Sequence, residues 1–66
     1  MKNLIKIERA RKNLTQKDLA ELISVSRQTI NAIELGKYIP STVLALKIAN
    51  VFEKSVNDIF ILEDHD

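Results

Sequence analysis

Hydrophobic and polar positions follow a helical spacing most clearly in residues 26–36. At about 100° per residue, Ile30 and Ile33 fall on one side of a helix. The opposite side carries a guanidinium and two carboxamides, contributed by Arg27, Gln28 and Asn31. Ser26 is a preferred N-cap residue, and Gly36 supplies the left-handed residue that commonly follows the last turn. The pattern predicts a short helix with one buried and one polar face.

Two further helices are predicted before this one. The first covers residues 3–13. The second begins at Thr15, where Asp18 completes a start that resembles a capping box, and it continues through Ile23. The positions expected to be buried are Leu4, Ile7 and Ala10 in the first helix and Leu19, Ala20, Leu22 and Ile23 in the second.

Two more helices are predicted after it. Pro40 forces the preceding residue into an extended conformation, and Ser41 caps a fourth helix. Ser55 and Asp58 form another cap, which opens a short final helix. The apolar positions of these helices are Leu44, Ala45, Ile48, Ala49 and Phe52 in the fourth and Val56, Ile59 and Phe60 in the last. Residues 61–62 either end that helix or form a short extended segment, and the pattern is too brief to decide.

Only Ser24 and Val25 separate the second predicted helix from the cap of the third. Two helices joined so closely must cross at a steep angle, which is the geometry of a helix-turn-helix. The polar side of the third helix then offers groups that pair bidentately with guanine and adenine edges, and the small Ala32 among them permits close approach. The alternative is an ordinary surface helix with a solvated face.

Length and composition limit the classes of protein that this chain can belong to. Sixty-six residues form one domain, residues 1–66, which is marginally stable without help. There is no Cys, and the single His65 lies in an acidic tail, so neither a disulfide nor a metal site is expected, and no cofactor is predicted. No run approaches ~20 apolar residues and no secretory signal is present, which predicts a cytoplasmic protein without a membrane segment.

An enzyme is not expected. No Ser, Thr or Asp has an ordered His nearby in the sequence, and Gly36 is the only glycine, so there is no glycine-rich phosphate loop.

The charges are unevenly placed although their sum is only +1. The first quarter of the chain is basic, with Lys2, Lys6, Arg9, Arg11, Lys12 and Lys17, and the end is acidic, with Glu53, Asp58, Glu63, Asp64 and Asp66. Basic residues serve either solvation or phosphate neutralisation. Gln16 lies in the first turn of the second predicted helix, where its amide and free backbone N–H groups can reach one phosphate. Lys37 and Tyr38 lie just after the third predicted helix and add a cation and a phenol that could contact phosphates.

The chain resembles the Cro and phage-repressor type of helix-turn-helix domain, also called the xenobiotic-response-element family, and especially its small stand-alone prokaryotic regulators. The likeness is carried by residues 14–20, 25–31, 33–34, 36–38, 40–41 and 46–49. It implies an all-α fold of five helices, binding of double-stranded DNA as a homodimer, and regulation of transcription, usually repression.

The resemblance also assigns roles to residues. It implies that Arg27 and Gln28 read bases, that Gln16 contacts a phosphate, and that Arg9 and Glu34 form a partly buried ion pair. Ala32 stands where some phage relatives carry a base-reading side chain, so readout is expected to shift to Asn31 or Thr29. The base contacts expected are therefore Arg27, Gln28, Thr29 and Asn31, and the phosphate contacts are Arg11, Gln16, Ser26, Lys37 and Tyr38.

Self-association is expected through the C-terminal third, because apolar residues there exceed what one small core needs. The interface residues expected are Leu46, Phe60, Ile61 and Leu62, with ordinary core as the alternative for Phe60. A protein-interaction module such as an antitoxin is the competing function. An interaction module would tolerate apolar or acidic residues on the third helix, whereas this chain has Arg27, Gln28 and Asn31, which favours DNA.

Overall fold

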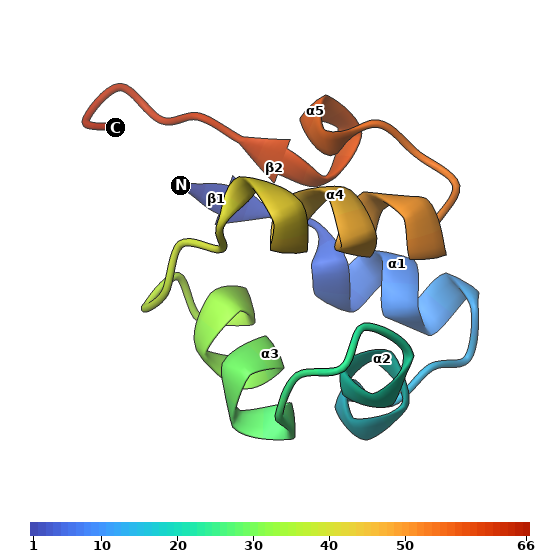
Figure 1. The fold of residues 1–66 in the computed structure, drawn as a ribbon. Helices are drawn as coiled ribbons and strands as arrows, with labels where there is room; N and C mark the ends of the chain where they lie inside the picture. The colour runs from blue at the N-terminus through green and yellow to red at the C-terminus, as the bar shows by residue number, and fades with distance from the viewer.

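A computed structural model describes residues 1–66 and contains five helices and one two-stranded sheet (Figure 1). In chain order the elements are β1 (Lys2–Asn3), α1 (Ile5–Arg11), α2 (Gln16–Leu22), α3 (Arg27–Glu34), α4 (Thr42–Val51), α5 (Val56–Ile59) and β2 (Phe60–Ile61). The predicted five-helix architecture is confirmed. None of the helices is both long and apolar enough to cross a bilayer.

The predicted caps are present at the starts of α2, α3 and α4. The Thr15 hydroxyl accepts from the Asp18 amide at 3.0 Å, and the Asp18 carboxylate accepts from the Thr15 amide at 3.0 Å. That backbone hydrogen bond lowers the pKa of Asp18 below its usual 3.8, because it favours the ionised carboxylate. Side-chain oxygens of Ser26 and Ser41 accept from amides three residues later in α3 and α4.

Helix α3 ends where Gly36 adopts a left-handed conformation, with φ of +74°. The Gly36 amide donates to the Ile33 carbonyl at 3.0 Å and the Lys37 amide to the Ala32 carbonyl at 2.9 Å. Both bonds belong to a Schellman motif, which satisfies carbonyls left free at a helix end. Helix α2 ends in the same way with Ser24 at φ of 59°, and this residue shapes the tight turn into α3.

One apolar core is shared by all five helices and by β2. Its fully buried side chains include Leu19 of α2, Ile30 and Ile33 of α3, Ile48 of α4 and Ile59 of α5. The predicted stripe on α4 is also buried, apart from the half-buried Ala45.

The prediction for the buried face of α1 is wrong. Ile5 and Glu8 are the buried residues of this helix, whereas Ile7 is 51% exposed and Ala10 is also exposed. The helix begins at Ile5, and Leu4 serves as its N-cap. A buried acidic residue at the fourth helical position is tolerated because Glu8 accepts from Arg11 at 3.0 Å and from Lys54 at 3.2 Å.

A smaller error concerns Leu22, which was expected in the core but is 60% exposed. It is the last residue of α2, so the chain turns away before a neighbouring helix covers it. Leu19, Ala20 and Ile23 carry the buried side of α2 as expected.

The C-terminal segment forms a strand, which settles the choice between helix and extended segment. Strand β2 pairs antiparallel with β1, with Lys2 opposite Ile61 and Asn3 opposite Phe60. Phe60 was expected within the last helix, but this pairing extends the chain there and turns its ring into the core, where it is 7% exposed. The two chain ends therefore lie together.

Beyond β2 the acidic tail folds back onto the N-terminus. The Met1 amine lies 3.2 Å from a Glu63 carboxylate oxygen and 3.1 Å from one of Asp66. Hydrogen bonding to Asp66 and then Glu63 raises the pKa of this amine above its usual 8.0. Ligand atoms of Glu63, His65 and Asp66 lie within 4.8 Å of one another, but the carboxylates of Glu63 and Asp66 both pair with the Met1 amine.

Candidate nucleic-acid interface

The outer face of α3 is a polar surface with a shallow hollow. Arg27, Gln28 and Asn31 are exposed, and the half-buried Ala32 lies among them. With Leu35 and Lys37 they surround a hollow of about 300 Å³. The small side chain of Ala32 leaves room there for an approaching group.

The opposite face anchors α3 to the rest of the domain. Ile30 and Ile33 are 0% and 1% exposed, so the helix is held by its apolar side. Helix α2 packs against α3 at a steep angle after the short turn (Figure 1). This arrangement presents α3 on the surface while α2 supports it from behind.

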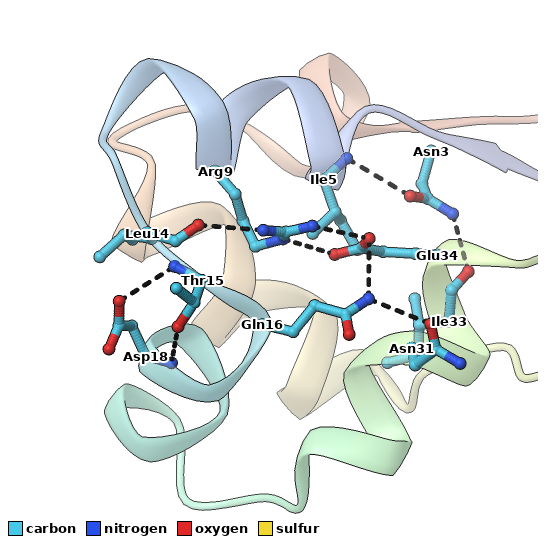
Figure 2. A network of polar contacts seen from close by, with 10 residues as sticks. All are labelled: Asn3, Ile5, Arg9, Leu14, Thr15, Gln16, Asp18, Asn31, Ile33 and Glu34. Carbon is cyan, nitrogen blue, oxygen red and sulfur yellow. Dashed lines mark hydrogen bonds and ion pairs between the residues drawn. The ribbon is translucent and has the colours of Figure 1, made fainter.

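Arg9 and Glu34 form a bidentate ion pair between α1 and the end of α3 (Figure 2). Arg9 Nε lies 2.7 Å from Glu34 Oε2, and Nη2 lies 3.1 Å from Oε1. The side chains are 13% and 8% exposed. Hydrogen bonding to Glu34 raises the pKa of Arg9, so the guanidinium stays charged. A third bond, from Nη1 to the Leu14 carbonyl at 2.9 Å, ties in the turn before α2.

Gln16 joins this ion pair to the polar face of α3. Its Nε2 donates to Glu34 Oε1 at 3.2 Å and to Asn31 Oδ1 at 3.1 Å (Figure 2). The sequence suggested a phosphate contact for Gln16 and gave no sign of these bonds. They follow from the crossing of α2 and α3, which a local pattern does not reveal.

Asn3 is a second residue whose role the sequence did not indicate. Its Nδ2 donates to the Ile33 carbonyl at 2.8 Å, and its Oδ1 accepts from the Ile5 amide at 3.3 Å. Strand β1 is thereby fixed to the last turn of α3.

The residues expected to contact phosphates fall into two groups. Ser26, Lys37 and Tyr38 are exposed at the two ends of α3. Arg11 is exposed on α1 but pairs with Glu8, and Gln16 is held by Asn31 and Glu34. Thr29, expected at a base, is half-buried and shares its hydroxyl with Ser26 at 2.9 Å.

The residues expected at a dimer interface also differ in exposure. Leu46 is 50% exposed, Ile61 40% and Leu62 77%, and Val43 on the same helix as Leu46 is 63% exposed. Phe60 lies in the core of the single chain, so any interface would use the other residues.

Two helices joined by a tight turn, the second with a buried apolar side and an exposed polar side, define a helix-turn-helix protein. The helix-turn-helix family model HTH_3 matches residues 5–59, and the chain belongs to this family, the Cro and phage-repressor type of transcriptional regulator. The match ends before β2.

Known relatives extend the likeness over the whole chain. The sequence is 59% identical to an uncharacterised HTH-type transcriptional regulator of Methanocaldococcus jannaschii, with 100% of both chains covered. It is 47% identical to the uncharacterised HTH-type transcriptional regulator YgzD of Bacillus subtilis, again over 100% of both chains. The ImmF control region 10 kDa protein of Bacillus phage phi105 is 37% identical over 54 residues, which are 82% of this chain and 60% of that protein.

Proposed function

We propose that this protein is a cytoplasmic, sequence-specific DNA-binding repressor that binds a pseudo-palindromic operator as a homodimer. The observation that carries the proposal is the exposed polar face of α3, with Arg27, Gln28 and Asn31 around the hollow beside Ala32. A major groove about 12 Å wide admits such a helix, and arginine and carboxamide side chains match base edges there. Repression is inferred from the likeness to phage repressors.

Within this proposal the side chains divide into base readers and phosphate contacts. Arg27, Gln28 and Asn31 read bases because they are exposed on the central part of the face. Thr29 contributes less, because its hydroxyl is engaged by Ser26. Lys37, Tyr38 and Ser26 contact phosphates at the rim. Arg11 and Gln16 contribute less to phosphate binding, since each already forms a hydrogen bond within the protein.

A homodimer is proposed because one recognition helix reads too few base pairs to find a site in a genome. Two-fold symmetry would place two copies of α3 about 34 Å apart on one side of the duplex, which requires half-sites one helical turn apart. Each subunit of this dimer would be a single domain of residues 1–66, in which β2 would carry Ile61 towards the proposed interface.

Substitutions in the two groups should have different effects on DNA binding. Arg27→Ala or Gln28→Ala should weaken binding to the best site by about 1–3 kcal/mol and remove the preference at one base pair. Lys37→Ala should weaken all duplexes alike and reduce the salt slope by about one unit, because it removes one phosphate contact. Selection of bound sequences from random duplexes, followed by titration at several salt concentrations, measures both effects.

The same selection separates the proposal from its competitor. A recovered motif with two-fold symmetry supports an operator-binding dimer. If the wild type enriched no motif, or if Arg27→Ala left the motif unchanged, α3 would not be the reading helix. The interaction-module interpretation would then be preferred.

A further inference from the structure

We propose that the Arg9–Glu34 ion pair, acting through Gln16, fixes the direction of the Asn31 amide so that Asn31 offers DNA a hydrogen-bond donor. The inference rests on the proposed function, since it assigns specificity within the same reading face. Asn31 then reads an acceptor on a base, and Gln16 is a positioning residue for that readout.

The first step is the direction of the Gln16 amide. An ionised carboxylate only accepts hydrogen bonds. Glu34 is held by two bonds from Arg9 and its side chain is 8% exposed, so its orientation is set from inside the domain. The amide atom of Gln16 that lies 3.2 Å from Glu34 Oε1 must therefore be its nitrogen. The reverse orientation would place two acceptors against each other in a site partly shielded from water.

The second step is the direction of the Asn31 amide on α3, which follows from that of Gln16. The same Gln16 nitrogen lies 3.1 Å from the Asn31 amide and has a second hydrogen to donate. Asn31 must therefore turn its oxygen towards Gln16. Its nitrogen lies on the side away from Gln16, as Figure 2 shows.

The third step is the consequence for base recognition. A free asparagine pairs bidentately with adenine, because it accepts from N6 and donates to N7. In this protein the Asn31 oxygen already accepts from Gln16, which uses one of its two lone pairs and sets its direction, so the bidentate pairing with adenine is disfavoured. A donor alone suits guanine O6 or N7 and thymine O4, whereas at adenine it bonds N7 but leaves the neighbouring N6 donor without a partner, and at cytosine it faces the N4 donor. Asn31 should thus prefer guanine or thymine at the position it contacts.

Selection from random duplexes with matched variants tests the inference. Asn31→Ala locates the base pair, because preference there should fall by about 5-fold to 100-fold. Gln16→Met has a similar length but no amide, so it frees the Asn31 oxygen. The preference at that same pair should shift towards adenine by a comparable factor, while the pairs lost in Arg27→Ala and Gln28→Ala stay unchanged. Lys17→Met, at an exposed position on the same turn, should change no position.

The outcomes are distinct. A uniform loss of affinity in Gln16→Met without a shift at the Asn31 position would overturn the inference and leave Gln16 as a phosphate contact. A wild type that selected adenine at that position would also overturn it. A wild type that enriched no motif would contradict the proposed function instead.

A measurement on the wild type keeps the inference testable if a variant is poorly folded. Nuclear magnetic resonance of the free protein should show the side-chain amide protons of Gln16 protected from exchange, and those of Asn31 exchanging rapidly with water. Protected Asn31 protons would mean that the two amides are arranged in the opposite sense, which contradicts the inference.

Discussion

Replacing Glu34 with glutamine should lower the free energy of unfolding by about 3–5 kcal/mol, the cost of breaking a largely buried ion pair. The pair is 13% and 8% exposed, and Arg9 would keep its charge without a counter-charge. Gln16 would also face an amide in place of a carboxylate. Urea denaturation of the wild type and the variant at neutral pH measures the difference.

Glu21→Gln is the matched control, because Glu21 is an exposed acidic residue of α2. An exposed charge contributes only about 0–1 kcal/mol, so this variant should unfold close to the wild type. If Glu34→Gln also unfolded within 1 kcal/mol of the wild type, the pair would contribute no more than a surface contact.

The proposed homodimer should dissociate into monomers when Leu46 or Ile61 is replaced with aspartate. Both side chains are apolar and about half exposed in the single chain, at 50% and 40%, so a charge there is tolerated by the monomer. The same charge buried in a symmetric interface would meet its own copy across the two-fold axis. Affinity for a palindromic duplex should fall by about 10²–10⁴, because the second half-site is no longer bound by a linked subunit.

Sedimentation at micromolar concentration and titration with duplexes of one or two half-sites would measure both changes. Leu22→Asp adds the same charge to another exposed leucine, 60% exposed at the end of α2, outside the proposed interface. It should leave the dimer intact. A wild type that sediments as a monomer and binds the palindrome without cooperativity would rule out the proposed dimer.

The parts of the fold that the sequence predicted depend on neighbouring residues. A cap needs a hydroxyl and an amide three residues apart, so Thr15, Ser26 and Ser41 could be assigned from the sequence. The buried pair Ile30 and Ile33 also follows from one turn of helix. These features were predicted correctly because no distant residue competes with them.

The errors arose where distant residues decide the outcome. The burial of Glu8 is tolerated partly because Lys54, far along the chain, reaches it, and the hydrophobic spacing of the first helix gave no sign of a buried carboxylate. Phe60 left the last helix because β1, at the other end of the chain, pairs with its backbone. The hydrophobic spacing within one segment gives no information about the contact of Glu8 with Lys54 or the pairing of β1 with β2.

The candidate site divides in the same way. The exposed polar residues of α3 could be found from its helical pattern, and the resemblance to a family supplied the pairing of Arg9 with Glu34. The bonds from Gln16 to Asn31 and Glu34 could not be found, because they depend on how α2 crosses α3. The proposed base specificity would therefore depend on tertiary structure as well as on the residues of α3.

Gly36 ends α3 in a left-handed backbone conformation, which restricts the chirality of any residue that replaces it. A Cβ added to Gly36 would meet no atom within 4 Å, so the position has ample room for a side chain. The φ angle of +74° is nevertheless strained for L-amino acids, at a cost of about 1–2 kcal/mol. D-alanine at position 36 satisfies that angle and has fewer conformations than glycine in the unfolded chain. The end of α3 therefore requires a left-handed backbone conformation, which glycine adopts without strain, and the small size of glycine is incidental.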